Sequence, residues 1–160
     1  MTQTITKESV DRLTALYHNL LDHWNNNNAS SFANLFAEDG DVVGFDGSQM
    51  KGPVEIQAEL SKIFSNHKVS SYVSIIREIR PLSSSTYLLR AVVGMVPPGQ
   101  KEINPKVNAI QSLIASTEND EMKILLFQNT PAAFHGREQL SSELTQELQE
   151  TLNNQKKNSV

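Results

Sequence analysis

The 160-residue sequence contains no cysteine. It can therefore form no disulfide, bind no metal through thiolates and use no cysteine nucleophile. It also lacks long hydrophobic runs: no stretch approaches the roughly 20 apolar residues that cross a bilayer. The opening residues MTQTITKESV have neither the basic nor the apolar part of a secretory signal. We therefore expect a cytoplasmic protein with no membrane partner.

An excess of positive charge is absent as well. The 14 Lys and Arg residues are outnumbered by 18 Asp and Glu residues, which gives a formal net charge of -4. No predicted face gathers basic side chains, whereas nucleic acids are bound chiefly by neutralising phosphates. We therefore expect no nucleic acid partner, and instead a small molecule or a second copy of the chain.

Helical periodicity dominates the first half of the sequence. Apolar residues recur every three or four positions in three segments, which predicts amphipathic helices with Thr6 as the first N-cap. These predicted helices span Lys7–Asn25, Ala29–Ala37 and Gly52–Asn66. Each presents one apolar face, so all three are expected to pack on one side of the same core.

Between the second and third helices we expect a turn at Glu38-Asp39-Gly40 and then a β-hairpin. The pair Asp46-Gly47 separates two short strand-like runs, 41–45 and 49–51. An Asp-Gly pair in this position favours a tight hairpin turn, because both residues tolerate positive φ.

The second half is predicted to be mostly β-structure. Four runs rich in Val, Ile and Tyr, separated by turn segments, predict an antiparallel meander over 69–80, 86–96, 107–116 and 122–129. Strands this long must twist and curl. The fold expected is α+β: a strongly curved antiparallel sheet forming a cone, with the three N-terminal-half helices on one side.

The C-terminal segment has a different pattern. Leucines recur every fourth residue from Leu140 to Leu152 among Glu, Gln and Ser, which predicts a further helix over 138–152. Its narrow apolar seam suits docking on its own domain or on a dimer mate. We therefore predict a domain over 1–137, and an extension over 138–160 that consists of this helix and a disordered tail from Asn153.

Specific motifs match this order of elements. They include DHWN at 22–25, FANLFAED at 32–39, RAVVGMVPPGQ at 90–100, INP at 103–105, NAIQ at 108–111 and FQNTPAAFHGR at 127–137. On these residues, over about 7–140, the chain resembles the NTF2-like (cystatin-like cone) superfamily and, within it, the SgcJ/EcaC group of SnoaL-like proteins. The resemblance implies a cone fold. It implies no particular reaction, because the superfamily includes isomerases, hydrolases, dehydratases, association domains and transport factors.

One departure from the superfamily bears on chemistry. In the steroid-isomerase branch, an Asp on the strand after the second helix acts with a Tyr on the first helix. The corresponding strand position here is Gly44, and Tyr17 matches that Tyr only if the helix register is stretched. This argues against proton abstraction of that type, and leaves open whether the protein is an enzyme.

Candidate pocket residues come from several elements. Aromatic side chains that could line a cone are Tyr17, Trp24 and Phe45, although such residues are more often core. Asn108, Gln111 and Asn129 occupy strand positions where apolar residues would pack better, and either orient a ligand or satisfy backbone groups. By strand alternation Asn129 and Gln128 lie on opposite faces. We favour Asn129 for the inner face because it shares its face with Phe127.

Two charged candidates complete the set. Arg90 lies mid-strand, and either pairs with a carboxylate such as Glu78 or binds an anionic ligand group. His135 is a weak acid-base candidate near the predicted mouth of the cone, because its ordinary pKa lies near neutrality; a capping or dimer contact is the alternative. No His, Asp and Glu grouping has metal-ligand spacing, so we expect no metal and no cofactor.

These observations predict a homodimeric protein that binds a small, largely apolar or polyketide-like molecule, with metal-independent enzymatic activity on it as an open question. The alternative is a non-catalytic association module that uses the sheet face and the C-terminal helix.

Overall fold

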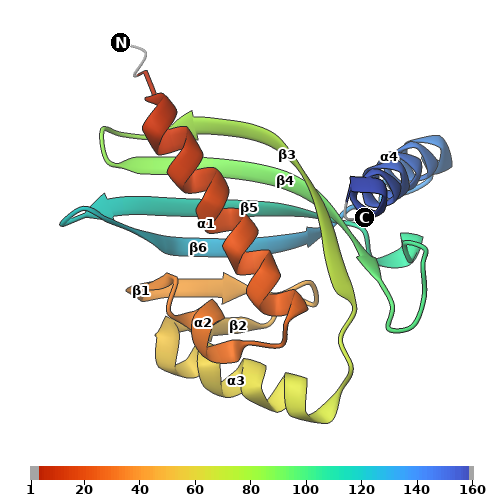
Figure 1. The fold of residues 1–160 in the computed structure, drawn as a ribbon, viewed down its shortest axis with the longest axis horizontal. Helices are drawn as coiled ribbons and strands as arrows, with labels where there is room; N and C mark the ends of the chain where they lie inside the picture. The colour runs from red at the N-terminus through yellow and green to blue at the C-terminus, as the bar shows by residue number, and fades with distance from the viewer. Residues whose placement is uncertain (1–3, 159–160) are drawn as a thin grey trace.

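A computed structural model describes residues 4–158, which form four α-helices, a short 3-10 helix and six strands (Figure 1). The helices are α1 (Lys7–Asn25), α2 (Ala29–Ala33), α3 (Gly52–Asn66), η1 (Pro105–Val107) and α4 (Glu138–Asn158). The strands are β1 (Phe36–Val43), β2 (Gln49–Lys51), β3 (Ser71–Pro81), β4 (Thr86–Val96), β5 (Ala109–Glu118) and β6 (Glu121–Pro131). No helix in this part of the chain is long and apolar enough to cross a membrane.

The first helix has the bounds that the sequence predicts. The Thr6 side chain accepts a hydrogen bond from the Ser9 N–H at 3.1 Å and so caps the helix. The buried stripe consists of Leu13, Leu16, Tyr17, Leu20 and Leu21. In Figure 1, α1 runs diagonally across one face of the sheet, where these side chains form the centre of the core.

The six strands form one sheet in the order β2-β1-β6-β5-β4-β3. The predicted meander of β3 to β6 is confirmed, as is the β1–β2 hairpin around Asp46 and Gly47. One pair differs from a purely antiparallel sheet: β1 runs parallel to β6. The sheet is strongly bent (Figure 1), which confirms the α+β cone.

The second helix ends earlier than predicted. It stops at Ala33, and residues 38–40 lie within β1 instead of forming a turn. Gly40 explains the difference, because a Cβ atom at this position would lie 2.4 Å from the Ile124 carbonyl oxygen of β6. Its missing side chain lets the two strands approach, and this long-range contact overrides the local turn signal.

The C-terminal helix is longer than predicted. It continues to Asn158, so residues 153–158 are helical and not a disordered tail; the last two residues of the predicted tail lie outside the described residues. Strand β5 begins at Ala109 and not at residue 107, because η1 occupies 105–107.

The two faces of the sheet carry separate cores. Helices α1, α2 and α3 cover the inner face, with a large cluster of buried side chains that includes Tyr17, Leu89 and Phe127. Helix α4 packs on the outer face over a smaller cluster, formed by Val73, Val92, Ile103, Leu144 and Leu148. Figure 1 shows α4 extending past the end of the sheet, away from the other helices.

Candidate functional site

A chain of hydrogen bonds crosses the inner core and joins three of the predicted pocket residues. The Tyr17 hydroxyl donates to Gln111 Oε1 at 2.6 Å, and Gln111 Nε2 donates to Asn129 Oδ1 at 2.8 Å. Asn129 Nδ2 then donates to the Val43 carbonyl at 3.3 Å. The chain therefore links α1, β5, β6 and the end of β1.

This inner polar chain is enclosed by apolar side chains. Tyr17 and Gln111 are 0% exposed and Asn129 is 9% exposed, so only the Asn129 end approaches the surface. Burial raises the pKa of Tyr17 strongly, and the Ser74 hydroxyl beside it opposes that shift. Tyr17 is therefore a neutral hydrogen-bond donor at every physiological pH.

The chemistry available at this chain is hydrogen bonding between neutral groups. A hydroxyl and two amides can orient a carbonyl or hydroxyl, but none of them is a base near neutral pH. Within residues 4–158, no three His, Asp or Glu side chains are grouped so that they could hold a metal ion. A ligand atom can therefore join the inner polar chain only by replacing one of the partners that these groups now have.

The strand-parity prediction for β6 is confirmed in its geometry. Asn129 faces the core beside Phe127, whereas Gln128 is exposed on the other face. Because Gln111 and Asn129 are directly paired across β5 and β6, their amides meet on the same face. Val43 and Ser74 are the participants that sequence reasoning missed, since a backbone carbonyl and a small hydroxyl give no sequence signal.

Two predicted aromatic residues lie away from this chain. The Trp24 ring packs edge-on against Phe64, with centroids 5.3 Å apart, and its Nε1 donates to the Ser70 carbonyl at 3.0 Å. Phe45 is 40% exposed in the turn of the β1–β2 hairpin. Trp24 thus has a structural role at the end of α1, and Phe45 lies outside the core.

Arg90 lies on the outer face. Its Nη1 is 3.5 Å from Glu78 Oε2, and its Nε donates to Ser112 Oγ at 3.4 Å. The guanidinium side chain is 43% exposed. The structure therefore shows the pairing with Glu78 that was one of the two readings of this residue.

Asn108 lies beneath α4 and not in the cone. Its Nδ2 donates to Thr145 Oγ1 at 2.9 Å, while its Oδ1 is buried with no hydrogen-bond partner. His135 is exposed in the segment that precedes α4. Of the eight predicted pocket residues, the structure brings together Tyr17, Gln111 and Asn129, and places the other five elsewhere.

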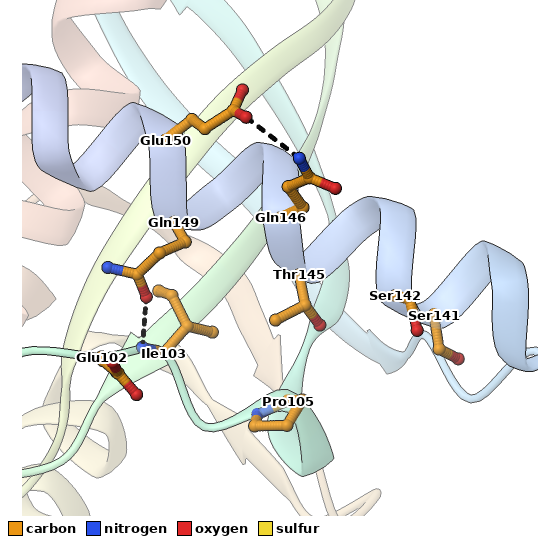
Figure 2. Close-up of a pocket in the computed structure, with 9 residues that line it drawn as sticks. All are labelled: Glu102, Ile103, Pro105, Ser141, Ser142, Thr145, Gln146, Gln149 and Glu150. Atoms are coloured by element: carbon orange, nitrogen blue, oxygen red, sulfur yellow. Dashed lines mark hydrogen bonds between the residues drawn. The ribbon is translucent and has the colours of Figure 1, made fainter.

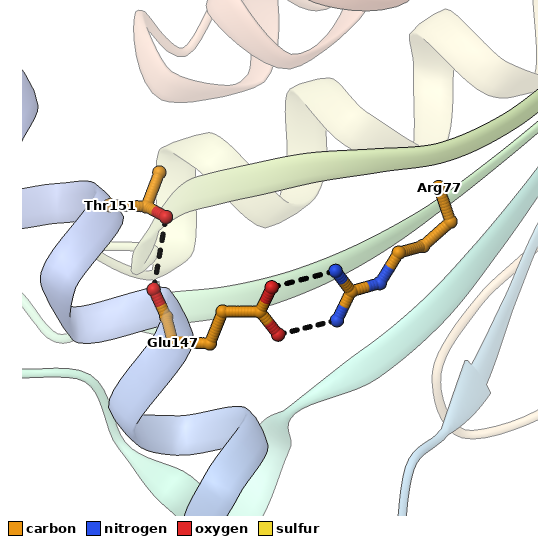
Figure 3. Close-up of polar contacts among 3 residues, drawn as sticks. All are labelled: Arg77, Glu147 and Thr151. Atoms are coloured by element: carbon orange, nitrogen blue, oxygen red, sulfur yellow. Dashed lines mark hydrogen bonds and ion pairs between the residues drawn. The ribbon is translucent and has the colours of Figure 1, made fainter.

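Helix α4 is attached to the sheet by polar as well as apolar contacts. Arg77 of β3 donates two hydrogen bonds to the Glu147 carboxylate, at 2.7 and 2.5 Å (Figure 3). Gln149 accepts from the Ile103 N–H at 2.8 Å (Figure 2).

An open groove of about 570 Å³ lies between residues 141–150 of α4 and segment 102–105. Figure 2 shows mainly hydroxyl, amide and carboxylate side chains along it.

The cone shape, the helices on its inner face and the six-strand order define the cystatin-like, NTF2-like fold, and solved structures share it. A domain of unknown function with a cystatin-like fold from Nostoc punctiforme has a TM-score of 0.75 at 21% identity, covering 96% of this chain and 99% of that one. An NTF2-like protein of unknown function from Shewanella oneidensis has a TM-score of 0.63 at 14% identity, covering 76% and 98%.

A third similar structure carries a more specific description. A Thiobacillus denitrificans protein described as a calcium/calmodulin-dependent protein kinase type II association domain has a TM-score of 0.65 at 8% identity, covering 74% of this chain and 93% of that one. No protein-family model matches the sequence. No curated protein matches it either. At these identities the comparisons establish the fold alone.

Proposed function

We propose that this protein binds a small, largely apolar molecule at the inner polar chain, as a member of the SgcJ/EcaC group that its second half resembles. Asn129 supplies the hydrogen bond to the ligand, Tyr17 and Gln111 hold Asn129 in place through the rest of the chain, and no metal takes part. The observation that carries the proposal is the continuous chain of neutral polar groups, drawn from four elements into an apolar core.

The Asn129 end is the point of entry. Asn129 is the least buried of the three side chains, at 9% exposed, and its bond to the Val43 carbonyl, at 3.3 Å, is the longest of the three. A ligand carbonyl replaces the Val43 oxygen as acceptor for Asn129 Nδ2. The apolar body of the ligand displaces the hairpin turn that holds Phe45, a turn that is already at the surface.

Nuclear magnetic resonance of the side-chain amide groups tests this function. The ¹⁵N-labelled protein is titrated with 2-naphthol and with 1-tetralone, and the organic extract of freshly purified protein is analysed by mass spectrometry. We expect the NH₂ signals of Gln111 and Asn129 to move while those of exposed Gln128 stay fixed. Unmoved signals with both probes, together with an empty extract, would contradict the proposal.

A second candidate function, assembly of copies of the chain, is favoured by the outer face. Helix α4 covers one end of this face and leaves a cross-strand row of apolar side chains, Leu88, Ile114 and Leu126, beyond it. Ile114 and Leu126 are only partly buried. A second copy packed on this row would bury it and form a homodimer, and the likeness to an association domain accords with this role.

Sedimentation velocity distinguishes this candidate. The protein is expected to sediment as a dimer at micromolar concentration, and Ile114→Lys is expected to give a monomer because it places a charge in the centre of the interface. Ala58→Lys, at an exposed position of α3 on the other side of the molecule, serves as the matched control and should remain dimeric. A monomeric unmodified protein would exclude assembly through this face.

A further inference from the structure

A second cavity, separate from the inner polar chain, lies along the free edge of β3. It has a volume of about 380 Å³. Helix α1 contributes His18, Asp22 and Asn25 to its wall, and β3 contributes Tyr72 and Ser74. The C-terminal part of α4 closes the third side. The cavity is therefore bounded by a strand edge and two helices.

The backbone of Tyr72 points toward this edge. Met95 of β4 pairs with Tyr72, but its carbonyl points away from β3 and accepts a hydrogen bond from the Asn104 N–H at 2.9 Å. The Asn25 side chain accepts from the Tyr72 N–H at 2.8 Å and donates to the Tyr72 carbonyl at 3.3 Å. A primary amide thus already docks on the edge of β3 in the manner of an added strand.

The next edge position has no such partner. In an antiparallel ladder, alternate residues direct their N–H and C=O to the same side, so the Ser74 peptide groups face the edge as those of Tyr72 do. Among residues 4–158, no hydrogen bond from a side chain or from an element outside the sheet reaches the Ser74 backbone. Ser74 therefore offers one donor and one acceptor to an extended chain.

The charge of the cavity selects what can bind beside that edge. Asp22 and His18 lie one helical turn apart on α1. Within the described part of the chain, neither side chain has a hydrogen bond or ion pair, and no lysine or arginine lines the cavity. Asp22 therefore supplies an unpaired carboxylate to the cavity, which favours an ammonium group.

We propose that this edge pocket binds the amino-terminal end of an extended peptide. The α-ammonium group lies at Asp22. The first peptide unit pairs with the Ser74 backbone, at the edge position that follows the one where Asn25 bonds to Tyr72. Leu21 and Val73, both buried, give the first side chain apolar walls. The volume is within the range of small-ligand pockets and admits only the first residues of the peptide.

Binding of three matched dipeptide amides tests the proposal. Alanyl-phenylalaninamide, its N-acetyl derivative and its analogue methylated at the peptide nitrogen are titrated into ¹⁵N-labelled protein. We expect the free amine to bind about tenfold more tightly than the acetylated compound, because a charge-assisted hydrogen bond is lost. The methylated analogue should also bind more weakly, and the Ser74 amide signal should move.

Variants locate the contribution of the carboxylate. Asp22→Asn should abolish the tenfold preference for the free amine, while Glu8→Gln, which removes an exposed carboxylate from the first turn of the same helix, should preserve it. Asp22 is exposed, so the variant is expected to fold, which circular dichroism verifies. Equal affinity for the free and acetylated peptides, or a preference that survives Asp22→Asn, would overturn the proposal. So would an unmoved Ser74 signal.

Discussion

Each face of the sheet buries an amide side chain: Gln111 on the inner face and Asn108 on the outer face. The two residues are close in the sequence but differ in their hydrogen bonds. Gln111 on the inner face has a partner for its oxygen and for its nitrogen, at 2.6 and 2.8 Å. Asn108 beneath α4 bonds through its nitrogen alone, and its oxygen has no partner. The buried amide of the inner face therefore has hydrogen-bond partners for both its oxygen and its nitrogen, whereas the buried amide of the outer face has an oxygen without one.

The difference follows from what surrounds each amide. The partners of Gln111 come from α1 and β6, and Tyr17 lies 94 positions away in the sequence, so its network fixes the relative positions of distant elements. Asn108 has one side-chain partner, Thr145 on α4. A satisfied polar network specifies a single arrangement of its elements, while a partly satisfied one costs stability. The inner face is thus the part that defines the cone.

The largest effect is expected for Gln111→Leu. The change retains side-chain bulk but leaves the Asn129 oxygen buried without a partner and leaves the Tyr17 hydroxyl with Ser74 alone. The unsatisfied oxygen and the lost Tyr17 hydrogen bond should together lower the free energy of unfolding by about 4 kcal/mol, measured by urea denaturation. A loss below about 1 kcal/mol would show that water or a rearrangement replaces the network.

Leu148→Ala tests the apolar part of the outer face. Leu148 is 0% exposed between α4 and the sheet, so the truncation should cost about 3 kcal/mol through lost contacts and a residual cavity. Leu140→Ala, at a position 36% exposed on the same helix, is the matched control and should cost less than about 1 kcal/mol. Similar losses in both would contradict the docking of α4 by its central turns.

Tyr17→Phe removes one hydroxyl from the inner polar chain and should cost about 2 kcal/mol near neutral pH. Burial raises the pKa of Tyr17 above its ordinary value of 10.0. Stability from the neutral hydroxyl is therefore present below pH 10 and is lost as the unfolded chain ionises above it. Denaturation curves from pH 8 to 11 should show a steeper decline for the unmodified protein than for the variant. Parallel declines would contradict this assignment.

Glu147→Gln is expected to cost only about 0.5 to 1 kcal/mol, because the pair with Arg77 is 42% exposed on both sides. The hydrogen bond from Arg77 is the main cause that lowers the pKa of Glu147 below its ordinary 4.5. The stabilisation is thus present above pH 4.5 and disappears as the pH falls through the lowered value. The two proteins should become equally stable in acid; a difference that persists there would refute the ion pair as its source.

Asn108→Leu should have the smallest effect, with a change of less than about 1 kcal/mol in either direction. It removes an oxygen that has no partner, and the released Thr145 hydroxyl is only partly buried. Comparison with Gln111→Leu by the same urea denaturation directly tests the contrast between the two faces. A loss of unfolding free energy as large as that of Gln111→Leu would contradict the difference between the two faces.

Local pattern was enough to predict much of the fold. The bounds of α1, the third helix and the β1–β2 hairpin follow from apolar spacing, a side-chain cap and an Asp-Gly pair, all of which act within a few residues. The start of β1 was not predictable this way, because it depends on the contact between Gly40 and Ile124 across the sheet.

The candidate site was predictable only in part, for a related reason. Alternation separated Gln128 from Asn129, but it could not tell which face of a strand is inner when both faces carry apolar residues. The sequence pattern therefore groups Arg90 and Asn108 with Gln111, whereas the structure places them on the outer face. The irregular registers at 76–78 and 114–115 add a further shift that a sequence pattern does not reveal.

Helix α4 follows, in the sequence, all the elements that it covers. The cone can form from residues that precede it. The site where α4 packs closely, at which a Cβ atom on Gly94 would lie 3.0 Å from the Ile103 side chain and 3.2 Å from Leu148, is then still uncovered. Synthesis runs from the N-terminus, so each nascent chain passes through a stage in which α4 is not yet available to cover the outer face. Docking of α4 is then itself the step that protects the new protein from aggregation through that surface.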